Sequence, residues 1–303
     1  MTIPFIKYSK VWLIISAVVA IVSVVFLAKW GLKPGIDFTG GSLLEVSFEK
    51  SRPEHDLIQK TWEDLGQKNA IIQKSGDKSL IMRTGFLTED QHQLVLRDLR
   101  SKYAIDGNTM REDRFETIGS AVSKQLRTRA LWAIILVNLG IILYIAYAFR
   151  AVSRPVASWK YGVLAIVALV HDVLLVMGVF ALLGHYFGTE VDIPFVVAIL
   201  TVLGYSVNDT IVVYDRVREN LIRRGSANFA DVVNNGLNET LMRSINTTMK
   251  TTLPLFALFF LGGSTIHSFV LALIIGIISG AYSSIFIATP MLVLVEKWQH
   301  KSA

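Results

Sequence analysis

Long apolar stretches constrain this chain more than any other feature of its sequence. Five such stretches contain almost no ionisable group; the exceptions are His171, Asp172 and Asp209. Because about 20 residues at 1.5 Å each cross the hydrocarbon core of a bilayer, each stretch predicts a membrane-spanning helix. The stretches are residues 11–28, 130–149, 161–183, 193–213 and 269–295.

A further apolar run, residues 251–263, is too short to cross a membrane by itself. A spanning helix in this region must begin near Ser244, which brings Lys250 into the membrane. The first run is longer than the apolar core of a secretory signal and ends at Lys29 and Trp30, which are typical interfacial anchors. We therefore predict six spans, the first of them an uncleaved anchor.

The composition supports a membrane protein over an ordinary soluble enzyme. Hydrophobic residues make up 52% of the chain and charged residues only 18%, where a soluble domain carries about 25%. There is no cysteine, which excludes disulfides, thiolate metal sites and cysteine nucleophiles. No HExxH or Walker motif occurs, so we expect neither an enzyme nor a bound metal or cofactor.

Positive charges indicate how the spans are oriented. The net charge is +6, but Lys and Arg gather at the two termini and after the second and fourth spans, and the short connections 184–192 and 262–267 contain none. By the positive-inside rule, both termini are cytoplasmic. The basic excess then marks topology rather than a nucleic-acid-binding surface. The residues concerned are Lys7, Lys10, Arg150, Arg154, Lys160, Arg216, Arg218, Arg223, Arg224, Arg243, Lys297 and Lys301.

These assignments divide the chain into three parts. Residues 1–31 hold the cytoplasmic N-terminus and the first span, and residues 130–303 hold the other five spans. Residues 32–129 lie between them and contain 16 Lys and Arg against 15 Asp and Glu. This nearly neutral segment is long enough to bury a core, and the orientation makes it extracytoplasmic.

The pattern of residues 32–129 predicts an α+β domain. Strands are expected at 42–48, 70–73, 80–83 and 114–118, where apolar residues alternate with polar ones or form short runs. One helix is expected to open at Pro53 and another at Thr88, which is followed by two acidic residues. The resulting β-α-β-β-α-β order is that of a ferredoxin-like sandwich, a fold that serves many functions.

Ionisable residues inside the predicted spans are candidates for function. A charge at the bilayer centre costs about 2.5–3.5 kcal/mol on insertion scales, so such residues usually face a partner or a water path. Counted from the cytoplasmic ends of their spans, Asp209 and Lys250 reach similar depths, which allows an ion pair. The alternatives are a purely structural pair, or a Lys250 that snorkels to the interface.

Three further patterns can be explained by local backbone structure and packing. The glycines of residues 35–41 (GIDFTGG) suit a tight turn before a strand. Small residues recur every four positions at Gly276, Gly280, Ser284 and Ala288, which permits close helix packing in lipid. The cytoplasmic segment 214–243 has apolar residues on one helical face, which predicts an amphipathic helix on the membrane surface or a plain connector.

Together these residues resemble the SecD/SecF family of bacterial protein-export proteins. The resemblance covers essentially the whole chain and is most specific from Gly204 to Asn220. It rests on GIDFTGG at 35–41, HD at 171–172, GYSVNDTIVVYDRVREN at 204–220 and RSINTTMKTT from Arg243. The matching positions include Gly35, Asp37, Phe38, Gly40, Gly41, Gly204, Asn208, Asp215 and Arg216.

The resemblance implies membership of the resistance-nodulation-division superfamily, which couples proton flow to work outside the membrane. It implies that Asp209 carries the proton and that Asp172 and Arg243 support the relay, beside His171 and Lys250. The sequence departs from the family at Lys250, where a small or hydroxylated residue is usual. The implied partners are SecD, YajC, the SecYEG channel, the SecA motor and a translocating preprotein.

Two other functions remain open at this point. One is half of a small-molecule or lipid exporter of the same superfamily, although such chains normally carry about twice the spans. The other is a scaffold that holds translocon subunits together without transport. The paired carboxylates inside the membrane favour proton-driven protein export in the bacterial plasma membrane over both.

Overall fold

The computed structural model describes residues 2–66, 70–105, 107–148, 156–224 and 228–301, so Arg150 and Arg154 lie outside the described residues. The chain forms two compact units. The helical unit comprises residues 1–33 and 131–303, and the α/β unit comprises residues 34–130.

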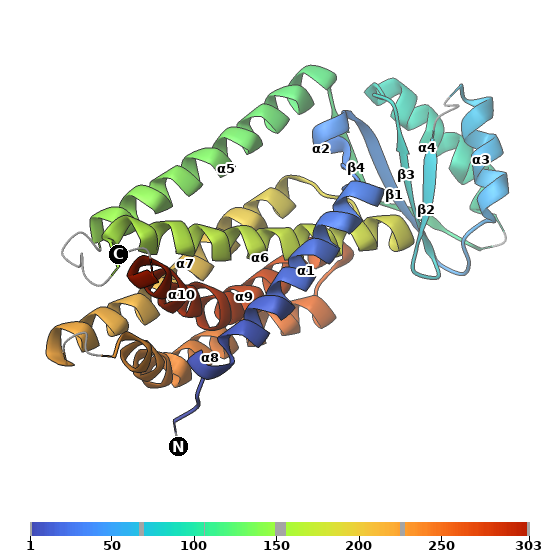
Figure 1. Cartoon of the computed structure of the whole chain (residues 1–303). Helices are drawn as coiled ribbons and strands as arrows, with labels where there is room; N and C mark the ends of the chain where they lie inside the picture. The colour runs from blue at the N-terminus through green and yellow to red at the C-terminus, as the bar shows by residue number, and fades with distance from the viewer. Residues whose placement is uncertain (1, 67–69, 106, 149–155, 225–227, 302–303) are drawn as a thin grey trace. The chain divides into compact units, whose positions relative to one another are not determined.

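The α/β unit is a four-stranded sheet with two helices, α3 (His55–Asp64) and α4 (Glu89–Tyr103), on one of its faces (Figure 1). The strand order is β2-β3-β1-β4 and each neighbouring pair is antiparallel. This is the predicted ferredoxin-like order. The strands are β1 (Gly41–Phe48), β2 (Ile71–Ser75), β3 (Ser79–Thr84) and β4 (Met110–Ile118).

Alternation in the strands builds the core of this unit. Leu44, Val46 and Phe48 of β1 point to the helical side, where they join Trp62 of α3 and Leu99 of α4 in one buried cluster. The predicted start of α4 is confirmed, because Thr88 and Gln91 form a reciprocal capping box. Helix α3 was predicted to begin at Pro53. It begins two residues later, at His55, and Glu54 is its N-cap.

Five helices of the described residues are long and apolar enough to cross a membrane. Four are α1 (Ser9–Trp30), α5 (Ser120–Ala148), α6 (Ser158–Phe187) and α7 (Ile193–Arg224). The last combines α9 (Ser264–Ser283), a π-helical turn (Ser284–Ala288) and α10 (Thr289–Lys301). In the turn, the Thr289 hydroxyl donates to the Ser284 carbonyl at 2.7 Å.

The sixth predicted span belongs to α8 (Phe229–Leu261). Helix α8 is not among the five strongly apolar helices. Asn246, Lys250 and four threonines between residues 246 and 252 lower the mean hydropathy of the predicted span. The count of six spans therefore stays a prediction.

Segment 214–243 differs from the predicted surface loop. Residues up to Arg224 continue α7, and residues from Phe229 open α8, so that the two helices pack side by side. A Cβ added at Gly236 of α8 would lie 2.8 Å from Val217 Cγ2 of α7. The apolar face of α8 is thus covered by protein rather than by lipid.

The N-terminal segment is fixed to α8 by two asparagines. The Asn238 amide oxygen accepts the backbone N–H of Ile3 at 2.7 Å, and the Asn234 amide oxygen accepts that of Ile6 at 3.2 Å. Both amide nitrogens donate back to the Ile3 carbonyl. Between them, Phe5 is 5% exposed and packs with Val213 of α7. We call these contacts the asparagine clamp.

Candidate functional site

Asp172 is the most enclosed carboxylate inside the helical unit, with 0% of its surface exposed. Three serine hydroxyls donate to it: Ser279 to Oδ1 at 2.6 Å, Ser206 to Oδ2 at 2.7 Å and Ser283 to Oδ2 at 2.6 Å. His171 Nδ1 lies 3.2 Å from Oδ1. Both carboxylate oxygens of Asp172 therefore accept hydrogen bonds.

The serine donors come from two helices, and the carboxylate that accepts from them lies on a third. Asp172 belongs to α6, Ser206 to α7, and Ser279 and Ser283 to α9, where they lie four residues apart and so share one face. The carboxylate therefore ties three helices together. We call Asp172 and its serine donors the serine knot.

Asp209 of α7 is almost as buried, with 6% of its surface exposed, but it has far fewer partners. Ser244 of α8 donates its hydroxyl to Oδ1 at 2.7 Å. Oδ2 is buried and has no hydrogen-bond partner among the described residues. Arg243 lies close enough to act on the Asp209 charge. Oδ1 of Asp209 thus accepts a hydrogen bond, whereas Oδ2 is buried but accepts none from the described residues; we call Oδ2 the open oxygen.

The two carboxylates are connected along α7. Ser206, a donor to Asp172, precedes Asp209 by three residues, a rise of about 4.5 Å along the helix. Thr210 lies beside them and shares a hydrogen bond of 2.7 Å with the Ser284 hydroxyl. The hydroxyl groups of Ser206, Thr210 and Ser284 therefore lie near one another beside the two carboxylates.

Small residues on α9 allow this close arrangement. A Cβ at Gly276 would lie 2.2 Å from Val202 Cγ2, and one at Gly280 would lie 2.8 Å from Ser206 Cβ, so neither position accepts a side chain without displacement. With the Ser284–Thr210 hydrogen bond, the predicted stripe faces α7 over its first three positions. The fourth position, Ala288, follows the start of the π-helical turn and also meets α7, because its carbonyl oxygen accepts a hydrogen bond from the Tyr214 hydroxyl at 3.2 Å.

The structure does not bring Lys250 to either carboxylate. Its side chain is exposed, and it makes no ion pair within the described part of the chain. Arg243, Asn246 and Lys250 of α8 instead lie on the surface, as does Asn208 of α7, which adjoins α8. We call these four residues the polar face.

The other predicted motif residues of α7 have structural surroundings. Gly204 is exposed and open, with no atom within 4 Å of an added Cβ. Arg216 Nε donates to Glu239 Oε2 of α8 at 2.6 Å, and Asn220 donates to the same oxygen at 2.8 Å. Asp215 pairs with Arg218, one turn later. The contacts with Glu239 join α7 to α8, whereas the Asp215–Arg218 pair lies within α7.

The glycine motif lies in the α/β unit and shapes its backbone. Gly35 caps a short helix, α2 (Ile36–Thr39), in which Asp37 and Phe38 lie. Gly40 and Gly41 follow with φ of 75° and 119°, which favour glycine, and a Cβ at Gly41 would lie 2.4 Å from the Thr84 carbonyl oxygen. The motif thus lets the chain enter β1 beside β3.

Sequence reasoning missed the residues that distinguish the two carboxylates. Ser206, Ser244, Ser279 and Ser283 are buried, and each donates to a carboxylate. Ser279 and Ser283, four residues apart in an apolar run, could have indicated a buried acceptor on a neighbouring helix, because lipid offers their hydroxyls no hydrogen-bond partner.

Comparison with known families gives two matches. Residues 100–298 match the family described as protein export membrane protein SecD/SecF, C-terminal. Residues 25–51 match the SecD/SecF GG motif. Together the two matches take in the glycine motif and the four ionisable residues of the predicted spans.

Curated relatives are similar over nearly the full length. The chain is 42% identical to the protein translocase subunit SecF of Thermobaculum terrenum, over 99% of this chain and 95% of that protein. It is 37% identical to the protein of the same name from Anaerolinea thermophila, over 95% of this chain and 92% of that protein.

A solved structure is also similar. The crystal structure of SecDF, a translocon-associated membrane protein from Thermus thermophilus, superimposes with a TM-score of 0.83 at 32% identity. The match covers 98% of this chain and 39% of that one, so the chain spans about two fifths of the length of the solved SecDF chain.

Proposed function

The chain belongs to the SecD/SecF family of protein export membrane proteins, and we propose on this premise that it is the SecF-type accessory subunit of the Sec machinery. Its relatives and its apolar helices make it a multi-pass protein of the bacterial membrane. In the proposed role it uses the proton motive force to promote late steps of preprotein translocation, without covalent chemistry.

Asp209 is the proton carrier in this proposal. The observation that supports it is the open oxygen: Oδ2 is buried and has no partner among the described residues, whereas Oδ1 is held by Ser244. A proton can bind at Oδ2 without first breaking a hydrogen bond. The serine knot offers no such position, because both oxygens of Asp172 already accept hydroxyl protons.

Protonation would act on the contact between α7 and α8. It removes the charge that attracts Arg243 and weakens the charge-assisted bond from Ser244. The serine knot keeps α6, α7 and α9 together meanwhile. We infer that α8 shifts against this fixed group and that the shift reaches the extracytoplasmic domain, residues 32–129, which retains the emerging preprotein.

The polar face supports a partner inside the membrane. Arg243 and Lys250 bring two positive charges to a surface that would otherwise meet lipid, and such groups usually pair with one another or with a neighbouring protein. A partner whose spans carry carboxylates at that depth would cover them. We propose SecD for this place, with YajC, SecYEG, SecA and the preprotein as further members of the assembly.

The proposed orientation places both termini in the cytoplasm. Lys7, Lys10 and Lys297 lie at one end of the helical unit with the ion pairs that join α7 and α8, and the connection 184–192 at the other end has no Lys or Arg.

The test compares Asp209→Asn with the unaltered protein in inner-membrane vesicles that contain SecD, SecYEG and SecA. We expect that the imposed proton gradient no longer stimulates preprotein export, because asparagine cannot carry the proton. Asp215→Asn, the same change at a carboxylate of α7 that pairs with Arg218, is the matched control and should retain the stimulation. Unchanged gradient-stimulated export by Asp209→Asn would refute the mechanism, provided that SecD still co-purifies with the variant.

A further inference from the structure

A basic cavity lies at the end of the helical unit where α1 begins and α10 ends. Its volume is about 720 Å³. Three lysines line it, Lys7, Lys10 and Lys297, against a single acidic residue, Asp231, whose carboxylate accepts a hydrogen bond from Asn228. The cavity therefore carries an excess of positive charge that the described residues do not neutralise.

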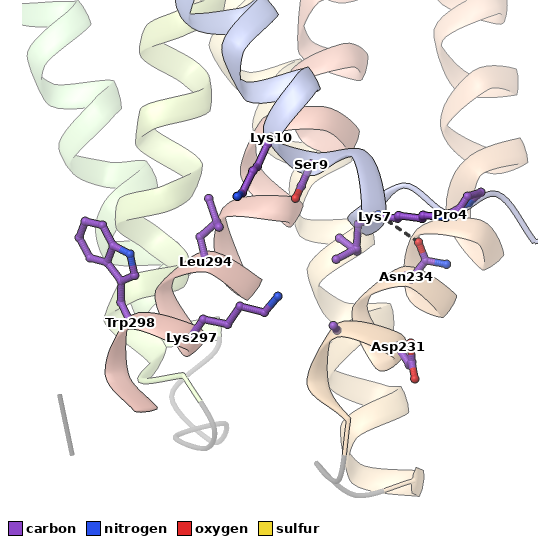
Figure 2. Close-up of a pocket in the computed structure, with 11 residues that line it drawn as sticks. Pro4, Lys7, Ser9, Lys10, Asp231, Asn234, Leu294, Lys297 and Trp298 are labelled. Atoms are coloured by element: carbon purple, nitrogen blue, oxygen red, sulfur yellow. Dashed lines mark hydrogen bonds between the residues drawn. The ribbon is translucent and has the colours of Figure 1, made fainter. Parts of the chain in front are cut away.

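The lysines come from opposite walls. Figure 2 shows Lys10 on α1 and Lys297 on α10 with their amino groups directed into the space between the two helices. Leu294 lies one turn before Lys297 and, with Ile6, supplies an apolar wall. Both lysines are exposed, and neither makes an ion pair within the described part of the chain. The cations are thus free to bind an anion from outside.

The position of the cavity identifies the kind of anion. Lys10 is followed directly by the first apolar span, and Lys297 ends the last one, so the cavity lies at the boundary between water and hydrocarbon. Trp298, beside Lys297, is 76% exposed, as expected of a ring at the level of lipid headgroups. Basic pockets between spans on the cytoplasmic side bind anionic headgroups.

We propose that this cavity binds the phosphate group of an anionic phospholipid, with Lys10 and Lys297 on the phosphate and the acyl chains running along Leu294 and Ile6. Because the N-terminal segment forms one wall and the asparagine clamp joins that segment to α8, a bound lipid would bridge α1, α10 and the helix that contacts Asp209. The lipid site goes beyond the proposed export role and does not depend on it.

The experiment uses the full-length protein in detergent and counts bound lipid by native mass spectrometry. The probes are phosphatidylglycerol and phosphatidylcholine, each offered alone and in competition. We expect selective binding of phosphatidylglycerol. Lys10→Gln with Lys297→Gln should weaken this binding roughly 25-fold, at roughly fivefold for each lysine near an anionic headgroup.

The matched control removes the same charge from the same end of the molecule. Lys160→Gln with Arg223→Gln eliminates a half-buried cation that lies 5.6 Å from the ring centroid of Trp159 and an exposed one that pairs with Glu219. This variant should retain wild-type affinity, as should Lys10→Arg with Lys297→Arg. Equal losses in the control and the cavity variant would overturn the site in favour of diffuse surface attraction.

Two further outcomes would also overturn it. Equal binding of phosphatidylcholine would show that the anionic charge plays no part. Displacement of phosphatidylglycerol by millimolar inorganic phosphate, together with phosphate binding that depends on the same lysines, would assign the cavity to a soluble anion.

Discussion

Asp172 of α6 and Asp209 of α7 are both buried carboxylates, and their surroundings are opposite. Asp172 accepts from three serines on two helices. Among the described residues, Asp209 accepts a hydrogen bond only from Ser244, and its second oxygen has no partner. The number of donors, rather than depth or residue type, separates a carboxylate that holds helices together from one that can exchange a proton. The serine knot holds three helices together, and Asp209 is the position that we propose for proton exchange.

The largest expected effect tests the serine knot. Asp172→Ala leaves three buried hydroxyls without their acceptor, and breaking a buried charged network costs roughly 3–5 kcal/mol. Asp209→Ala removes one hydrogen bond and an incompletely paired charge, so its cost should be at least twofold smaller. Denaturant titration of the two variants in detergent measures both. Equal losses would remove the distinction between the two sites.

An intermediate effect is expected at the glycine that approaches the knot. In Gly280→Ala the new methyl would lie 2.8 Å from Ser206 Cβ and push α9 away from the serine that holds Asp172. We expect a loss of roughly 1–3 kcal/mol of unfolding free energy, typical of overpacking.

Gly204→Ala is the control for that substitution, because no atom lies within 4 Å of its added methyl. It should be neutral or slightly stabilising, since alanine favours a helix over glycine by roughly 1 kcal/mol. If both glycine variants lose stability equally, close approach at the knot is not the cause.

The smallest effect is expected at Lys250. Because its side chain is exposed and pairs with neither carboxylate in the described structure, Lys250→Gln should change the unfolding free energy of the isolated chain by less than about 0.5 kcal/mol. Co-purification with SecD should weaken, since the proposed partner loses a cation to pair with. A large loss of stability in the isolated chain would instead place Lys250 in the network of Asp209.

Sequence patterns predicted the elements better than their contacts. Apolar runs located the strongly apolar spans, and alternation located β1 with its neighbours, because both signals report burial along one chain segment. The direction of Lys250 could not be predicted, since depth in the membrane leaves the rotation of a helix undetermined. Segment 214–243 was misassigned for a related reason: an apolar helical face suits a lipid surface and a neighbouring helix equally well.

The difference between the carboxylates was also hidden. A serine in an apolar run can be explained as a small residue that allows close helix packing. Only the three-dimensional arrangement of α6, α7 and α9 shows that Ser206, Ser279 and Ser283 all donate to Asp172. Asp172 and Asp209 were both identified as candidates from sequence. Their unequal roles depend on contacts between residues 34 to 111 positions apart.

The asparagine clamp has a consequence for how the protein is made. Ile3 binds Asn238, which lies 235 residues later in the chain. At about 5–20 residues per second, the ribosome needs roughly 10–50 s to reach Asn238 after it has made the N-terminal segment. During that time the first span is already available to the membrane while the clamp has no counterpart. The contacts that fix the N-terminal segment can therefore form only late in synthesis, after most of the helical unit has been made.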